Sequence, residues 1–225
     1  MKTKLKICKS KVRSPDGFWY AIADRFFKSV IFYDEELSSW FITNIMRNFD
    51  RGFKLESMVM ENVERPVHNK SDKEQKLDML LLLNDYHLVN VEANSEYRNE
   101  THIKNYIYYA SLYSELVKRS EKLDSQYELV SIDITSGLPS DYESVSIEKF
   151  YLQSDRQIRY IQNTVKMVYN LDKIMESWYN RDKKEIERYY YIMMLKMDEA
   201  ELEELIGYVS EENKKYLKAF RERLL

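Results

Sequence analysis

The chain has 225 residues, a formal net charge of −3 and a 44% share of hydrophobic residues. This length allows one well-buried core, and the composition indicates a globular rather than a disordered protein. The longest aliphatic run, Met79–Leu83, is far too short to cross a bilayer, so we expect no membrane partner. The N-terminus lacks the apolar segment of a secretory signal. A single cysteine, Cys8, fits a reducing cytoplasm.

Residues 1–17 are expected to form a basic N-terminal arm. Its basic residues are Lys2, Lys4, Lys6, Lys9, Lys11 and Arg13, with no acid among them. Such an arm can release counterions from a phosphate backbone, and it can equally be a solvated tail.

A helical pattern covers about residues 20–49, with a break near Tyr33. Asp34 is suited to cap the second helical segment, in which apolar residues recur at helical spacing. A strand is expected over about residues 55–63. A polar loop then leads to KLDMLLLLNDYHLVNVEANSE, residues 76–96, which reads as two apolar strands around a short turn.

In the rest of the chain, a predicted helix is followed by predicted strands, and the last third is mainly helical. A helix is expected over about 99–119, with Ile103, Ile107, Ala110 and Val117 on a shared face. Strands are expected at 128–135 and 145–152, a short strand near 164–169, and helices at 171–179, 183–195, 199–206 and 211–225. The predicted fold class is α/β: a core over residues 18–153, with a mainly helical C-terminal extension over 154–225 packed on it.

Several chemistries are excluded by residue usage. The chain has 4 glycines and none forms a phosphate-binding loop. It has no G-x-S-x-G elbow, and its scattered histidines with a single cysteine give no zinc constellation. What remains is carboxylate chemistry.

Each strand of the 76–96 stretch carries a carboxylate where a hydrophobic residue would fit. If a three-residue loop makes Leu83 face His87, then Asp78 lies directly opposite Glu92. A four-residue loop would offset the pair by one position. At about 5 Å and an effective dielectric near 20, the repulsion between two carboxylates is roughly 3 kcal/mol. A pairing of this kind therefore needs an explanation.

Three arrangements relieve the repulsion: a raised pKa on one acid, a nearby Lys or Arg, or a divalent cation between the two. Hard oxygen ligands on adjacent strands suit Mg²⁺, and a metal held this way activates water and stabilises charge on a phosphodiester. Strand alternation places Asn94 on the face of Glu92. The alternative is a pair of acids on a solvated face. Against it, the apolar run around Leu80 and Leu82 indicates a strand covered on both sides.

Several blocks resemble, in the same order, the PD-(D/E)XK family transposases, also called recombination-promoting nucleases, of the PD-(D/E)XK nuclease superfamily. DRFFKSVIFYDEELSSWFITNIM is similar to the family's opening helices, KLDMLLLL to its Asp strand and VNVEAN to its E-x-Q or E-x-N strand. IKNYIYYASLYSELV, YELVSIDI and the stretch from LDKIMESWYN to YYYIMMLKMDEAELEEL resemble later parts. The likeness spans roughly residues 18–206. It implies a restriction-endonuclease-like core of a helix, a three-stranded meander, a helix and further strands.

The resemblance also implies roles for individual residues. Asp78 and Glu92 would bind Mg²⁺, with Mn²⁺ as a substitute, and the main-chain carbonyl of Ala93 would add a ligand. Asn94 stands where most of the superfamily has Lys; it can hydrogen-bond the attacking hydroxide but carries no charge. Lys76, two residues before Asp78, is our candidate for the missing cation, with an exposed strand-end lysine as the alternative.

Other residues are candidates for the border of the site. Asp24 and Lys28 match the opening block and could equally form a surface ion pair. The positive end of the helix that follows can meet phosphate. Four residues near the start of this helix are candidates for DNA contacts: Arg98, His102, Lys104 and Asn105.

The implied function is an Mg²⁺-dependent DNA endonuclease that hydrolyses phosphodiester bonds in mobile-element or recombination processes. One alternative is a catalytically inactive relative that binds nucleic acid or a protein partner, motivated by Asn94 and the near-neutral charge. Another is a toxin or phage-defence nuclease, which shares the chemistry. The sequence leaves open the preferred DNA, the acceptance of RNA and the formation of a homodimer.

Overall fold

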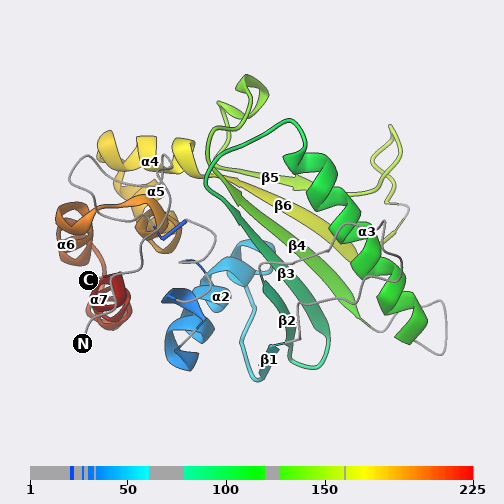
Figure 1. Ribbon diagram of the computed structural model, residues 1–225, viewed down its shortest axis with the longest axis horizontal. Helices are drawn as coiled ribbons and strands as arrows, with labels where there is room; N and C mark the ends of the chain where they lie inside the picture. Colours follow the sequence, from blue (N-terminus) through cyan, green and yellow to red (C-terminus); the bar gives the residue numbers. More distant parts are fainter. Residues whose placement is uncertain are drawn as a thin grey trace, which may run out of the picture.

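The computed structural model describes residues 21–22, 27, 30–32, 34–60, 79–119, 127–159 and 161–224. Figure 1 shows that these residues build an α/β fold with an open sheet, a long helix across one face and a group of helices to one side. None of the helices in these ranges combines the length and the apolar character that a membrane span requires.

The sheet is mixed and has six strands in the order β1-β2-β3-β4-β6-β5. The strands are β1 (Met58–Met60), β2 (Met79–Leu83), β3 (His87–Asn94), β4 (Glu128–Thr135), β5 (Ile147–Phe150) and β6 (Thr164–Asn170). β1, β2 and β3 form an antiparallel meander, β3, β4 and β6 run parallel, and β5 is antiparallel to β6. The parallel strands therefore bring their carboxyl ends to the same edge of the sheet.

The β2–β3 hairpin has the predicted register. Leu83 pairs with His87 across a turn at residues 84–86. Asn84 and Asp85 both have positive φ, at 52° and 54°, the backbone conformation of the hairpin turns whose twist matches that of the strands. Asn and Asp tolerate this conformation better than other residues with a side chain, so the local sequence selects this turn and fixes the pairing of the two strands.

The helices divide between the two faces of the sheet. They are α2 (Glu35–Phe49), α3 (Thr101–Arg119), α4 (Leu171–Tyr179), α5 (Lys183–Met193), α6 (Glu199–Tyr208) and α7 (Glu211–Leu224). The side chains of Val89 and Val91 belong to the large apolar core formed with α2 and the C-terminal helices. Leu88 and Leu129 instead form a small second cluster with Leu112 of α3. Among the described helices, α3 is the one that packs on this second face.

The apolar face of α3 that was expected from the sequence spacing points toward solvent in the structure. Ile103 and Ile107 are 62% and 50% exposed, and the buried side of the helix carries Asn105, Tyr108 and Leu112. The reason lies in the sheet: near the carboxyl ends of β3 and β4 the face under α3 is polar, so a polar side chain of α3 packs there.

The predicted elements agree closely with the observed ones at β4, β6 and α4. The order of a helix, an antiparallel meander, a helix and a parallel strand fits the expected α/β core. β6 lies between β4 and β5 in the sheet, so the sheet continues beyond residue 153, where the sequence placed the start of the helical extension.

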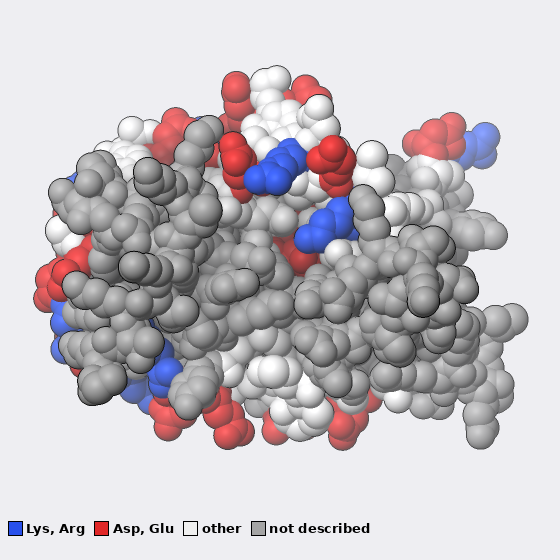
Figure 2. Space-filling model, in the orientation of Figure 1, with Lys and Arg blue, Asp and Glu red and all other residues white. Residues whose placement is uncertain are grey.

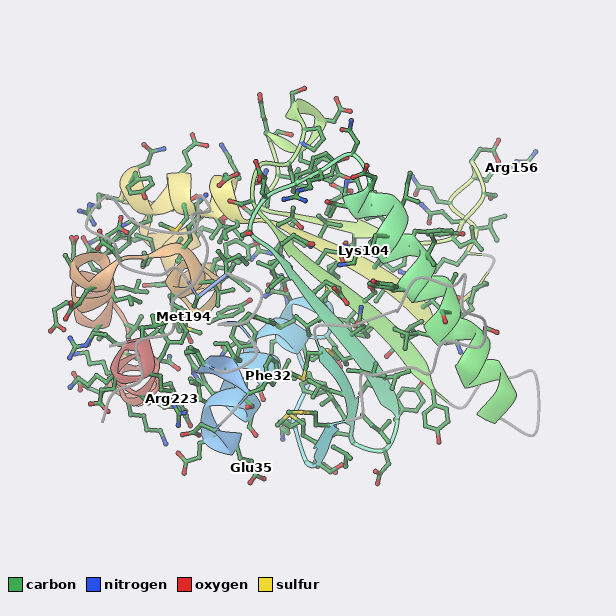
Figure 3. All side chains as sticks on the ribbon, viewed as in Figure 1. Phe32, Glu35, Lys104, Arg156, Met194 and Arg223 are labelled. Atoms are coloured by element: carbon green, nitrogen blue, oxygen red, sulfur yellow. The ribbon has the colours of Figure 1, made fainter. Side chains whose placement is uncertain are left out.

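Asp34 links the start of α2 to α7. Its Oδ1 accepts a hydrogen bond from the Leu37 N–H at 3.0 Å, and its Oδ2 pairs with Arg223 at 2.8 Å. Figure 3 shows Arg223 on α7 close to α2, whose first residue is Glu35. The hydrogen bond from the Leu37 N–H lowers the pKa of Asp34, and the Arg223 guanidinium lowers it further. Burial acts in the opposite direction but does not outweigh them.

Asp34→Ala should reduce the free energy of unfolding by about 1–2 kcal/mol, because it removes the cap and the ion pair together. Asp34→Asn should cost less, since an amide oxygen can still accept from Leu37. The lowered pKa means that this stabilisation is complete above the unfolded pKa and disappears as the pH falls through the folded value. Urea unfolding followed by circular dichroism at several pH values measures both effects. Exposed Asp141→Ala is the control, and equal stability of wild type and Asp34→Ala would contradict the assignment.

Candidate functional site

A row of polar side chains lies on the face of the sheet that α3 covers. Strand alternation puts Asn90, Glu92 and Asn94 of β3 on this face, since Val89, Val91 and Ala93 belong to the opposite core. In the parallel register, Asn90 pairs with Ser131, Glu92 with Asp133, and Asn94 with Thr135. We call these six residues of β3 and β4 the polar row.

Glu92 is at the centre of the polar row and is 0% exposed. It lies near the carboxyl end of β3, the end at which ligands generally bind in open α/β sheets. Asn94 is partly exposed at the end of the strand and donates a hydrogen bond to Thr135 Oγ1 at 3.2 Å. Ala93, between them, directs its side chain to the opposite face.

Four residues predicted from the sequence fall outside the described ranges. They are Asp24, Lys28, Lys76 and Asp78. Their predicted roles stay predictions. In the ranges that are described, no three His, Cys, Asp or Glu side chains are grouped so that they could hold a metal ion.

The acid that the structure places beside Glu92 is Asp133, which the sequence analysis did not single out. Asp133 is 1% exposed, and its Oδ2 accepts a hydrogen bond from Asn105 Nδ2 at 2.7 Å. Lys166 of β6 brings its Nζ to 2.8 Å from the same oxygen. The signal was present in the sequence, because Asp133 in SIDIT and Lys166 in TVKMV are charged residues inside apolar strands, as Glu92 is.

The arrangement places two carboxylates side by side in a buried environment. Neighbouring strands are about 4.8 Å apart, and at an effective dielectric near 20 two ionised groups at that distance repel by about 3 kcal/mol. Lys166 and Asn105 provide one positive charge and one donor against this repulsion. The side chain of Lys166 is 14% exposed, so little water screens the pair.

Several polar atoms around the two acids have no hydrogen-bond partner among the described residues. They are both amide atoms of Asn90, the Ser131 hydroxyl, Asp133 Oδ1, Asn105 Oδ1 and Lys166 Nζ. The ion pair of Lys166 with Asp133 is close in distance but is not aligned as a hydrogen bond. Buried groups of this kind cost stability, and a cluster of them is expected at a functional site more than in an ordinary core.

The residues expected to border the site separate into buried and exposed groups. Arg98 and Lys104 are exposed, and Lys104 is labelled on α3 in Figure 3. His102 packs between the rings of Tyr97 and Tyr142. Its pKa is lowered by burial and by Lys166, while Asp133 acts in the opposite direction. Asn105, expected as a DNA contact, is instead buried and bonded to Asp133.

A second polar cluster follows β4. Ser136 Oγ donates to Asp172 Oδ1 at 2.7 Å, and Lys196 Nζ donates to Ser136 Oγ at 2.6 Å; Lys196 also pairs with Asp172. In this cluster Ser136 and Lys196 both contact the Asp172 carboxylate. The cluster ties the end of β4 to α4 and to the turn that carries Lys196. Burial raises the pKa of Asp172, but the bonds from Lys196, Gly137 and Ser136 together lower it below its ordinary value.

The described residues on the face shown in Figure 2 give no separate indication of a nucleic-acid groove. On the described part of the face in Figure 2, basic and acidic residues are intermixed. A cleft of about 820 Å³ lies between α5, α6 and α7, with Lys183, Tyr190 and Glu203 among its lining residues. It is lined by C-terminal helices that pack on the other face of the sheet, so we place the candidate site at the polar row, on chemical grounds.

Two asparagines of this region should respond in opposite ways to the same substitution. Asn90→Leu should raise the free energy of unfolding by about 1–3 kcal/mol, because the buried amide has no described partner. Asn105→Leu should lower it by a similar amount, because Asp133 loses a donor in a buried setting. Thermal and urea unfolding of the two variants provide the measurement. Destabilisation by Asn90→Leu equal to that by Asn105→Leu would contradict the described hydrogen bonding.

No family model, no curated protein and no solved structure matches this chain.

Proposed function

We propose that this protein is a metal-dependent DNA endonuclease that hydrolyses phosphodiester bonds, with a restriction-endonuclease-like core. The observation that carries the proposal is the position of Glu92, a carboxylate in a row of polar side chains near the carboxyl ends of two parallel strands. The observed order of meander, helix and parallel strand is compatible with such a core. The resemblance of the sequence to PD-(D/E)XK transposases supports a role with mobile elements or in recombination.

The proposed site extends the observed hairpin pairing by one residue. Met79 pairs with Val91, so continued antiparallel pairing would bring Asp78 opposite Glu92. The fit with a metal is partial in the described residues: Glu92 and the Ala93 carbonyl are hard oxygen donors of the kind that Mg²⁺ prefers. When bound, Mg²⁺ would supply an activated water and charge stabilisation at the phosphate.

The chain's own residues would then orient the reaction. Asp78 and Glu92 would hold the ion, and Asn94 would hydrogen-bond the attacking water. The water oxygen would form a bond to phosphorus and lose a proton to solvent. The phosphorus–oxygen ester bond would break, and the leaving oxygen would take up a proton from solvent, which gives a phosphate end and a hydroxyl end. Because Glu92 is fully buried, this reaction requires the site to open when DNA binds.

A second candidate function is a catalytically inactive relative that binds nucleic acid or a protein partner. The full burial of Glu92 and the neutral Asn94 at the motif position favour it. Titration calorimetry with Mg²⁺ and Mn²⁺ separates the two candidates, because an inactive relative has no need of a metal at this position.

Glu92→Gln and Asp78→Asn should each reduce Mg²⁺-dependent nicking of supercoiled plasmid by at least about 100-fold, because each removes a charged ligand while conserving side-chain volume. The matched control is Glu128→Gln at the amino end of β4, where Glu128 pairs with His87. Circular dichroism checks that each variant is folded. Wild-type rates in both Glu92→Gln and Asp78→Asn would exclude the proposed site.

A further inference from the structure

A cavity of about 500 Å³ lies at the edge of the sheet that β5 forms. The end of α2, the segment that leads into β5, β5 itself and α5 provide its walls. Lys149 of β5 pairs with Met167, a residue of the large core. Directly paired residues share a face of the sheet, so Lys149 and the cavity that it lines lie on the face opposite the polar row.

Lys149 is a half-buried lysine at this cavity. Its Nζ donates a hydrogen bond to the Asn48 carbonyl oxygen at 2.6 Å, in the last turn of α2. An ammonium has three donors, and no carboxylate among the described residues forms an ion pair with this one. Burial lowers the pKa of Lys149, and the charges of Arg188 and Arg51 lower it further. Lys149 therefore has donors left for a ligand and positive neighbours in place of a counter-ion.

Arg188 of α5 lines the same cavity from the opposite wall. Its guanidinium lies over the ring of Tyr189, at 5.0 Å from the ring centroid. The ion pair that it forms with Glu185 is long, at 3.9 Å, and Glu185 also accepts a hydrogen bond from the Ser146 hydroxyl at 3.3 Å. The ring fixes the stem of Arg188, while its N–H donors stay accessible on a side chain that is 53% exposed.

The charges around the cavity do not cancel. Lys149, Arg188 and Arg51 provide three positive charges in this region. Glu185 is the carboxylate of the cavity that reaches one of them. Glu148 is also a lining residue, but alternation along β5 turns its side chain to the other face of the sheet. Two positive charges are thus left for an anion to compensate.

We propose that this cavity binds the dianionic phosphate group of a small phosphate monoester, held between Lys149 and Arg188. A guanidinium presents paired N–H donors that match phosphate oxygens, and an ammonium adds a second charge. Two uncompensated positive charges suit a monoester dianion better than the single charge of a phosphodiester. The volume falls within the range of small-molecule sites. This inference does not depend on the proposed nuclease function, because it uses no residue of the polar row.

The alternative is that both side chains are structural. Lys149 would then only satisfy a carbonyl at the end of α2, and Arg188 would only pair with Glu185 along α5. Such roles contribute to the stability of the fold but give no affinity for an anion. Phosphate binding and unfolding, measured on the same variants, separate the two possibilities.

The experiment compares the full chain with four single variants: Lys149→Met, Arg188→Gln, Glu185→Gln and Arg181→Gln. Arg181 is the matched control for Arg188. It is 50% exposed, lies over the ring of Trp178 at 4.7 Å and pairs with Glu204, and it does not line this cavity. Urea unfolding first shows that each variant is folded.

Calorimetry then measures the binding of inorganic phosphate, glycerol phosphate and dimethyl phosphate. The titrations are made at about pH 7.5, where a monoester is mainly the dianion, and at constant ionic strength set with a chloride salt. Dimethyl phosphate carries one negative charge and represents the phosphodiester of a nucleic-acid backbone.

Wild type should bind phosphate and glycerol phosphate with a Kd of about 1 mM or lower, and dimethyl phosphate at least about tenfold more weakly. Lys149→Met and Arg188→Gln should each weaken phosphate binding about tenfold, because each removes a charged donor. Glu185→Gln should strengthen it about fivefold, since a repelling carboxylate is lost. Arg181→Gln should bind as wild type does.

Four results would each overturn the inference. They are the absence of phosphate binding by wild type up to about 10 mM, wild-type affinity in folded Lys149→Met or Arg188→Gln, weaker binding by Glu185→Gln, and equal affinity for dimethyl phosphate and glycerol phosphate. The last result would indicate a general anion or backbone contact. None of these results bears on plasmid nicking or on Glu92, so the proposed function is tested separately.

Discussion

The parallel pairing of β3 with β4 sets two carboxylates, Glu92 and Asp133, side by side under α3. The rest of this face is arranged around that constraint. Lys166 arrives from β6 and Asn105 from α3, and both contact Asp133. The register cannot slip by one residue, because a slip would exchange these side chains with the valines and isoleucines of the opposite core.

The face under α3 changes character along the strands. At the amino ends of the parallel strands Leu88 and Leu129 form a small apolar cluster with Leu112, while toward the carboxyl ends the acids and amides collect. The opposite face is apolar along its length. The large core therefore stabilises the fold, and the small cluster anchors α3. The polar end lowers stability, which is the usual relation between a scaffold and a functional site.

Local signals in the sequence were sufficient for most of the described elements and for the register of the hairpin that carries Glu92. The Asp34 cap, the turn at Asn84 and the burial of Glu92 each follow from a few neighbouring residues. The partnership of Glu92 with Asp133 does not, because it depends on strands separated by a whole helix. The burial of Lys166 depends on β6 entering the sheet between β4 and β5, and no local pattern encodes a strand order. The inward face of α3 could not be predicted from its own sequence for a related reason. It packs on a sheet face that is itself polar, and the strands that form this face lie elsewhere in the sequence.

The place of the positive charge distinguishes this arrangement from one with a lysine at position 94. A lysine on the strand of Glu92 would extend past the strand end toward solvent, where Asn94 is partly exposed, and its four-carbon stem would be free to follow a substrate. Lys166 is enclosed and held at Asp133, so its charge stays within the closed face. The fixed internal ion pair gives this buried face a defined charge balance. Under the proposed function, opening for DNA would place Glu92 in contact with water while Asp133 and Lys166 stay paired. The three strands would then have separate tasks under that proposal: β3 would present Glu92, and β4 and β6 would maintain the Asp133–Lys166 ion pair beside it.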